Sequence, residues 1–167
     1  WKADTDKIAF YVTDCRSMGI VVLPPDVNTS EYDFAIEERN GDSPAIRFGL
    51  GAIKNVGQGP VDVILKERTK GGFKNLSDFA RRVDLRMVGK RALESLIKVG
   101  ALDSFGPRRA LLETLDRLVG MSSGHHRMSQ NGQMNLFGAT VIVTDEISLT
   151  NVQEGDPRDI LAWEKEL

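Results

Sequence analysis

The sequence has a single cysteine among its 167 residues, Cys15. An internal disulfide is therefore impossible, and one free thiol is typical of a protein in a reducing compartment. The sequence also lacks any apolar run long enough to span a bilayer, and it has no signal-peptide pattern. We therefore expect a cytoplasmic protein that has no membrane among its partners.

Residue patterns for catalysis and metal binding are equally scarce. No pair of carboxylates has the context of a two-metal nucleotidyl-transfer site, and Asp4 and Asp6 are better explained as helix caps. His125 and His126 have no Cys, Asp or Glu within ligand spacing, so we expect an exposed polar segment there. The sequence thus predicts no metal, no other cofactor and no catalytic residue. Because it starts at Trp1 without methionine and stops inside a helical pattern, we expect a piece of a longer protein.

Excess charge of one sign is absent overall but present locally. The formal net charge is −2, and 41% apolar residues are enough for a packed core. Residues 66–118 contain 13 basic and 7 acidic residues, a net charge of +6, whereas residues 1–45 carry −5 and residues 119–167 carry −4. A basic block is expected for a polyanion partner, although an ordinary solvated helical surface gives the same pattern.

The first 48 residues combine one helix with short strands. A helix is predicted over residues 6–18, where Cys15 falls on the apolar side. Short apolar or alternating runs predict strands over residues 20–23, 32–37 and 45–48. Three short strands so close together in the sequence favour a small antiparallel sheet.

From residue 49 to residue 119 the apolar spacing becomes helical. Helices are predicted over residues 50–56, 60–68, 76–83, 88–99 and 107–119. Their order is helix–hairpin–helix, linking helix, helix–hairpin–helix, which is a degenerate internal repeat. The predicted fold class is therefore mainly α, with a tandem helix–hairpin–helix (five-helix) domain preceded by one helix and short antiparallel strands. One such motif buries too little surface to be stable alone, whereas two share a core.

Val56–Pro60, with the sequence VGQGP, is the most informative segment. Glycine reaches positive φ and lets another backbone approach, and proline favours the first position of a helix. The peptide N–H groups of Gly57, Gln58 and Gly59 are thus expected at an exposed helix start, where they suit an anion such as a DNA phosphate. Lys54 precedes the turn and adds positive charge. The alternative is a purely structural turn between core helices.

A second hairpin is predicted over residues 100–106. It lacks the Gly-x-Gly pair, and Asp103 repels a phosphate unless it caps the next helix, so a structural role is the alternative. Basic residues near this hairpin are better candidates for contacts with the DNA backbone, with ordinary surface charge as the alternative for each. These candidates are Lys90, Arg91, Arg108 and Arg109.

Residues 120–138 are rich in Ser, Gly, Asn, Gln and His, which predicts a mobile linker. The linker contains one apolar peptide, formed by Gln133, Met134, Asn135, Leu136 and Phe137. An exposed apolar pair such as Leu136 and Phe137 is a typical anchor for a pocket on a partner. The alternative is that the pair folds back onto this chain.

Several segments of the chain match a known family. They are DKIAFY at residues 6–11, CRSMGI at 15–20, LPPDVN at 23–28, IRFGLGAIKNVG at 46–57, FK at 73–74, KRALESLIK at 90–98 and GALD at 100–103. With them the chain resembles the alpha subunit of bacterial DNA polymerase III, a C-family replicative polymerase. The resemblance covers about residues 4–119 and resumes at residues 133–137 and near residues 161–167.

The resemblance implies a division of the chain into four parts. They are residues 1–48, the end of a fingers-type region; 49–119, the tandem helix–hairpin–helix DNA-binding domain; 120–138, a flexible linker with a clamp-binding peptide; and 139–167, a connector. Within the connector, residues 139–155 are ambiguous between strand and loop, and a helix from Pro157 is predicted with Asp156 as its cap.

The resemblance also implies partners and a role. In that family the tandem domain grips double-stranded DNA behind the active site, and a Gln-x-x-Leu-Phe motif binds the beta sliding clamp. Gln133 to Phe137 fits this motif, with Met134 in place of the commoner leucine. The family's catalytic aspartates and Mg²⁺ belong to a palm upstream, so this chain is not expected to polymerise. Other polymerase III holoenzyme subunits are expected as partners through the longer parent.

Three classes of function follow from these patterns. The leading hypothesis is a non-catalytic fragment that binds duplex DNA without sequence specificity and tethers a polymerase to its clamp. The second is a helix–hairpin–helix protein-interaction module with no direct DNA contact. The third, a repair glycosylase or nuclease, requires a catalytic Lys or Asp in a pocket within a larger domain, and the sequence indicates neither.

Overall fold

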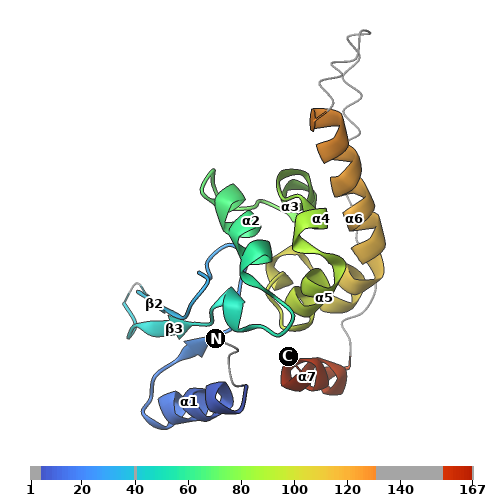
Figure 1. The fold of residues 1–167 in the computed structure, drawn as a ribbon. Coiled ribbons are helices and arrows are strands. Elements are labelled where there is room, and N and C mark those ends of the chain that lie inside the picture. Colours follow the sequence, from blue (N-terminus) through green and yellow to red (C-terminus); the bar gives the residue numbers. More distant parts are fainter. Residues whose placement is uncertain (1–4, 40, 131–155, 167) are drawn as a thin grey trace.

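The computed structural model describes residues 5–39, 41–130 and 156–166. This part of the chain is mainly helical, with one small sheet and two short 3-10 turns (Figure 1). The helices are α1 (Thr5–Ser17), α2 (Gln58–Arg68), α3 (Leu76–Arg82), α4 (Leu85–Val88), α5 (Lys90–Lys98), α6 (Arg108–Gln130) and α7 (Pro157–Glu166). The strands are β1 (Val22–Leu23), β2 (Ala35–Glu37) and β3 (Ala45–Arg47), and the 3-10 turns are η1 (Leu50–Ala52) and η2 (Asp103–Phe105). The predicted fold class is confirmed.

The three strands form a mixed sheet in the order β1-β3-β2. β2 and β3 pair antiparallel, with Ile36 opposite Ile46, as the sequence predicted. β1 and β3 pair parallel, with Val22 opposite Ile46, so the prediction of a wholly antiparallel sheet is wrong for this pair. The reason is the long connection after β1, because a parallel pair needs a crossover that a tight turn cannot supply.

The helical domain is built around α6, which packs against α3, α4 and α5 (Figure 1). In α5 the apolar residues follow helical spacing, and Leu93, Leu96 and Ile97 have no exposed surface. Leu50 of η1 and Phe79 of α3 belong to the same core. Each such side chain contributes about 1.5–3 kcal/mol when it is buried. The hairpins therefore connect helices that are held in place by a closely packed hydrophobic core.

The connection after β1 belongs to this helical core. Val27 is fully buried within it, and its N–H donates to the carbonyl oxygen of Ala101 at 2.9 Å. The Asn28 side chain donates to the carbonyl of Phe73 at 3.1 Å and accepts from its N–H at 2.7 Å. Packing thus joins residues 27–28 to the domain that we predicted to begin at residue 49.

Helix α6 continues well past the predicted end at residue 119. It reaches Gln130, so the prediction of a flexible linker is wrong for residues 120–130. Ser122 is fully buried and forms hydrogen bonds with the backbone of Val83 and Leu85 at the start of α4. These bonds stabilise the C-terminal part of α6, although its glycines disfavour helix. His125 and His126 accordingly lie on a helix. The predicted clamp peptide at residues 133–137 lies outside the described residues.

Side chains cap α3 and α7, and the cap at Asp156 was predicted. The Asn75 side chain accepts a hydrogen bond from the N–H of Asp78 at 2.8 Å, at the start of α3. The Asp156 carboxylate accepts from the N–H of Arg158 at 2.9 Å, at the start of α7. Both satisfy donors that a helix leaves unpaired in its first turn. In Figure 1, α7 lies below α5, and these two helices are in contact.

Candidate nucleic-acid interface

The first hairpin joins η1 to α2 and differs in detail from its predicted form. α2 begins at Gln58, with Gly57 as its N-cap in an extended conformation at φ −87°. Left-handed backbone is found instead at Asn55, with a φ of 66°. Pro60 is the third residue of α2 and not its first. The expectations of positive φ at the glycines and of proline at the helix start are therefore wrong, because Asn55 makes the turn and an N-cap is normally extended.

The amide groups at this helix start are nevertheless available. Gly57, Gln58 and Gly59 are all exposed, and none of their N–H groups has an acceptor among the described residues. The aligned peptide dipoles of α2 add partial positive charge at the same point. A Cβ on Gly57 or Gly59 meets nothing within 4 Å. The chain's own packing therefore does not require these glycines, and the surface above them is open to a partner.

The structure places the second copy of this hairpin at α4, Gly89 and α5. Four apolar positions of the first copy recur 32 residues later, and all eight residues are buried. The pairs are Ile53 and Leu85, Val56 and Val88, Val61 and Leu93, and Ile64 and Leu96. Gly57 corresponds to Gly89, the N-cap of α5. The prediction that residues 100–106 form the second copy is wrong, although this apolar spacing is visible in the sequence.

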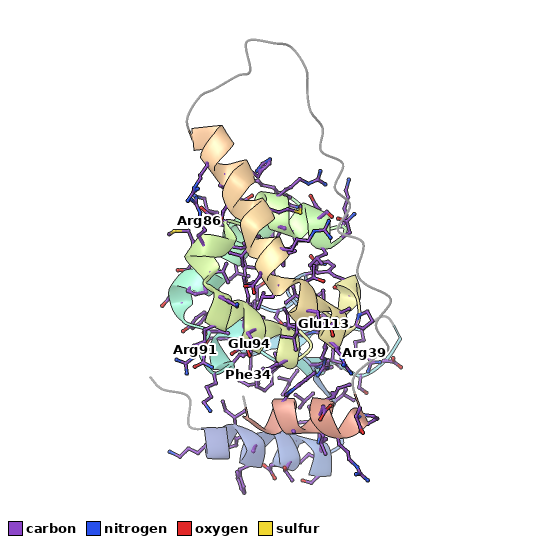
Figure 2. All side chains as sticks on the ribbon, turned by 90° about the vertical axis from the view of Figure 1, so that its right-hand side faces the viewer. Phe34, Arg39, Arg86, Arg91, Glu94 and Glu113 are labelled. Atoms are coloured by element: carbon purple, nitrogen blue, oxygen red, sulfur yellow. The ribbon has the colours of Figure 1, made fainter. Side chains whose placement is uncertain are left out.

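Lys90 and Arg91 form the exposed start of α5 in the second copy. Lys90 Nζ lies 2.6 Å from the Asp116 carboxylate of α6, in a pair that solvent reaches. Arg91 has no hydrogen-bond or ion-pair partner in the described part of the chain. Figure 2 shows Arg91 at the edge of the ribbon, on the side opposite to Arg39. Of these two predicted site residues, Arg91 has the more available charge.

The hairpin at residues 100–106 is closed by an ion pair between the buried Arg108 and the exposed Asp103. Arg108 is only 8% exposed, and its guanidinium donates to the Asp103 carboxylate at 2.9 Å and to the carbonyl of Lys98 at 2.9 Å. A Cβ on Gly100 would collide with this guanidinium. Arg108 is therefore not on the predicted DNA-binding surface, because its charge is used within the hairpin. Arg109 is exposed, with Glu113 at 3.4 Å, and remains a candidate.

The comparison with protein-family models agrees with this duplicated geometry. The model described as "Helix-hairpin-helix motif" matches residues 19–112, which is more than half of the chain. The chain belongs to the helix-hairpin-helix motif family. The match begins before residue 49, in agreement with the packing of Val27 into the helical core.

The relatives of this helix-hairpin-helix chain are large proteins. It is 42% identical to the DNA polymerase III subunit alpha of Vibrio cholerae over 98% of its own length and 14% of that protein. It is 43% identical to the subunit of the same name from Thermus aquaticus, again over 98% of this chain and 13% of that protein. The Deinococcus radiodurans subunit is 39% identical over 99% of this chain and 12% of that protein. The chain thus spans about one seventh of the length of these relatives, and the predicted resemblance is confirmed.

The helix-hairpin-helix repeat identifies one basic residue that the sequence reasoning missed. Arg86 lies 32 residues after Lys54, is exposed, and precedes Gly89 as Lys54 precedes Gly57. It donates to both carboxylate oxygens of Asp84, at 3.0 and 2.7 Å. This bond holds the pKa of Asp84 below its usual range. Arg86 can be identified in the sequence from the 32-residue offset between the two copies of the hairpin.

The described residues contain neither a metal-binding cluster nor a membrane-spanning helix. Within them, no group of three or more His, Cys, Asp or Glu side chains is placed to hold a metal ion. The same residues contain no helix that is both long and apolar enough to cross a membrane.

Proposed function

We propose that this chain binds the backbone of duplex DNA as one part of a longer, DNA polymerase III alpha-like polypeptide. The observation that carries the proposal is the exposed start of α2, where three N–H groups lack acceptors among the described residues. A helix start of this kind attracts phosphate through its free amides and its dipole. The relatives' names supply the context of DNA synthesis.

The proposed surface combines both copies of the hairpin. Two helix starts related by a repeat suit the two strands of a duplex. Their amides face phosphates rather than bases, so the binding is independent of sequence and weakens as salt rises. The proposed contacts are Lys54, Gly57, Gln58, Gly59, Arg86, Gly89, Lys90 and Arg91, with Arg109 as a further candidate.

A titration of fluorescently labelled duplex with the 167-residue chain, at two salt concentrations, tests this proposal. Gly57→Val combined with Gly59→Val should abolish binding, because the new side chains occupy the space that a phosphate needs. The matched control is Gly120→Val with Gly124→Val, since a Cβ at either of these α6 positions also meets nothing within 4 Å. Absent binding of the unaltered chain at low salt, or equal binding by both double variants, would contradict the proposal.

We further propose that residues 133–137 bind a sliding clamp. The support is the Gln-x-x-Leu-Phe pattern, which begins three positions after the last residue of α6. Leu136→Ala combined with Phe137→Ala should abolish capture of the chain by an immobilised bacterial beta clamp, because the apolar pair is the expected anchor. Met134→Leu, which restores the commoner residue, should keep or strengthen capture. Retained capture by the double alanine variant would contradict this role.

We propose that the chain alone does not polymerise DNA. The support is the sequence, in which no carboxylate pair has the context of a two-metal site. In this proposal the Mg²⁺-dependent step and the contacts with other holoenzyme subunits belong to the remainder of the longer polypeptide, in the cytoplasm. A primer-extension assay with the chain, Mg²⁺ and deoxynucleotides should give no product, and any extension would contradict the proposal.

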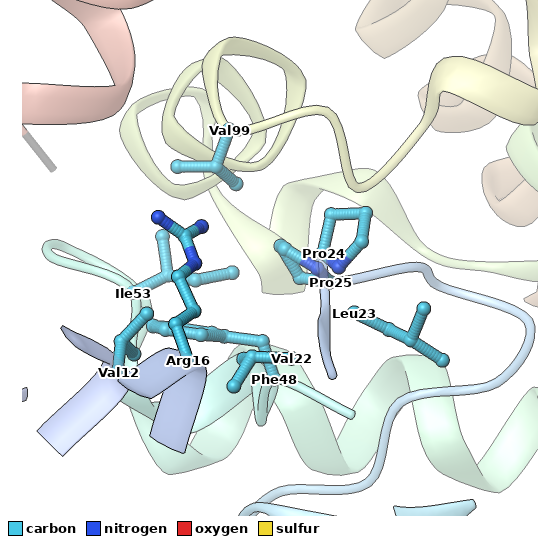
Figure 3. Close-up of a pocket in the computed structure, with 9 residues that line it drawn as sticks. All are labelled: Val12, Arg16, Val22, Leu23, Pro24, Pro25, Phe48, Ile53 and Val99. Carbon is cyan, nitrogen blue, oxygen red and sulfur yellow. The ribbon is translucent and has the colours of Figure 1, made fainter. Parts of the chain in front are cut away.

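A protein contact is the second candidate function, and one surface favours it. Phe10 and Tyr11 of α1 are 66% and 60% exposed, and Ile36 of β2 is 78% exposed. Large apolar groups that are exposed are typical of interfaces, and the Phe10 and Tyr11 rings lie side by side with centroids 5.7 Å apart. A cavity of about 310 Å³ lies beside α1, and Figure 3 shows Arg16 pointing across it toward Val99. If protein contact were the only role, alanine variants of the basic hairpin residues would leave function intact.

A further inference from the structure

The first hairpin is bonded to α5 by the side chain of a residue whose backbone conformation is unusual. Asn55 is the one non-glycine residue of the described ranges with positive φ, at 66°. Its side-chain Nδ2 donates to Ser95 Oγ at 3.1 Å, across 40 positions of the sequence. Asparagine tolerates left-handed backbone better than most residues. One exposed residue therefore both makes the turn and bonds to a distant helix.

The bond fixes the hairpin against a particular face of α5. Ser95 is only 3% exposed, so its position is set by the core. Arg91 lies four residues earlier in the same helix, and residues four apart share a helix face. The hydrogen bond from Asn55 to Ser95 therefore joins the first hairpin to the face of α5 that also carries Arg91.

The two hairpins are anchored in corresponding ways by one serine each. Ser122 of α6 accepts from the N–H of Leu85 at 3.0 Å and donates to the carbonyl of Val83 at 2.9 Å, which fixes the second hairpin. The first hairpin begins with η1, only three residues long, and Ser95 holds it through Asn55. Met87, which corresponds to Asn55 in the repeat, is 65% exposed. The Asn55 tie is therefore particular to the first hairpin.

We propose that Asn55 is a positioning residue for the phosphate site. Through Ser95 it sets the amides of Gly57, Gln58 and Gly59 in register with the Arg91 guanidinium, so that one duplex meets both copies of the motif at once. Glycine at position 55 would permit the turn without the bond, and alanine at position 95 would remove the acceptor. This role rests on the proposed DNA binding and adds to it a specific hydrogen bond, from Asn55 to Ser95, that aligns the two copies of the motif.

The test measures duplex affinity and thermal unfolding of the 167-residue chain for three variants. Asn55→Gly and Ser95→Ala should each weaken binding about fivefold, the effect of one lost hydrogen bond. The double variant should bind no more weakly than either single one, because both remove the same bond. Ser123→Ala is the matched control, since that hydroxyl bonds only to Val119 of its own helix, and it should leave affinity unchanged.

A coupling measurement separates positioning from general destabilisation. In an Arg91→Ala background, Asn55→Gly should have a much smaller effect on affinity, because the partner to be aligned is gone. Unchanged affinity in Asn55→Gly and Ser95→Ala, or equal losses with and without Arg91, would overturn the positioning role. If the Gly57→Val and Gly59→Val pair still abolishes binding, the proposed function survives that result. If the glycine pair binds as the unaltered chain does, the proposed function itself fails.

Discussion

At the scale of single residues, neighbouring arginines have different environments. Arg108 and Arg109 look equivalent in the sequence, yet Arg108 is buried against Asp103 and Arg109 is 57% exposed at its side chain. The physical reason is the turn before α6, which places the Arg108 guanidinium against Gly100 and leaves the Arg109 guanidinium in solvent. Consecutive helix residues point in different directions, but the sequence alone does not show which of the two faces the hairpin.

Arg108→Ala should therefore lower the free energy of unfolding by about 2 kcal/mol, because it removes several hydrogen bonds from a closed hairpin. Arg109→Ala should change it by less than about 0.5 kcal/mol, since exposed ion pairs contribute little. Urea unfolding monitored by circular dichroism measures both values. Equal effects of the two variants would show that Arg108 has no structural role.

Asp84 gives a pH dependence of known sign. Its hydrogen bond from Arg86, which is the main cause, keeps the pKa of the folded-state carboxyl below the ordinary value of about 3.9. The stability that this pair contributes is complete above that value and is lost as pH falls through the lower folded-state pKa.

Asp84→Asn should thus be less stable than the unaltered chain near neutral pH, by about 0.5–1 kcal/mol, as expected for a partly exposed pair, and Arg86→Ala should change stability in the same direction. The difference should shrink as pH falls from about 5 to about 2. Unfolding free energies measured across that range check the prediction, and parallel profiles for the variants and the unaltered chain would contradict it.

At the scale of elements, the C-terminal half of α6 is the largest departure from the sequence prediction. Glycine, serine and histidine composition indicated a linker, but local propensity is weak compared with packing. Ser122 is buried and satisfies both a donor and an acceptor at the start of α4. Such a contact between distant segments leaves no periodic signal in the sequence.

Ser122→Ala should accordingly destabilise the chain by about 1–3 kcal/mol, because it leaves the N–H of Leu85 buried without an acceptor. Ser123→Ala should have an effect below about 0.5 kcal/mol, since it removes only a bond within α6. Thermal unfolding of the two variants checks this difference. Hydrogen exchange should also be faster at Leu85 in Ser122→Ala, and unchanged exchange there would contradict the assigned contact.

At the same scale, the structure agrees with the sequence prediction for one part of the first hairpin and differs from it in another. The sequence correctly indicated an exposed helix start at Gly57 to Gly59, because the amide pattern follows from local backbone. It placed the left-handed residue wrongly, since Asn55 takes that conformation and bonds to Ser95. The choice between asparagine and glycine for this role depends on a helix 40 residues away.

At the scale of the whole molecule, the basic block serves two purposes. Part of its charge is used within the chain: Arg82 donates to the carbonyl of Gly71 at 2.7 Å and lies over the Phe73 ring, and Arg108 closes a hairpin. Another part, including Arg91, faces solvent (Figure 2). A net charge of +6 therefore overstates what is available to a polyanion.

The salt dependence of duplex binding should reflect the exposed part only. Arg91→Ala should reduce the slope of log affinity against log salt by about 1, the effect of one lost phosphate contact. Arg39→Ala is the matched control, because Arg39 lies on the opposite side of the molecule and pairs with Asp42 (Figure 2). Titrations at four or more salt concentrations measure both slopes, and equal slopes for the two variants would remove Arg91 from the surface.

The sequence by itself determined the class of fold, most helix positions, the exposed amides at Gly57 to Gly59 and the resemblance to a polymerase subunit. These features depend on apolar periodicity, capping and local backbone, which act over a few residues. Only the tertiary structure decided the parallel pairing of β1 with β3, the burial of Arg108 and the length of α6. Each of these depends on contacts between segments far apart in the chain, whose energies no local pattern records.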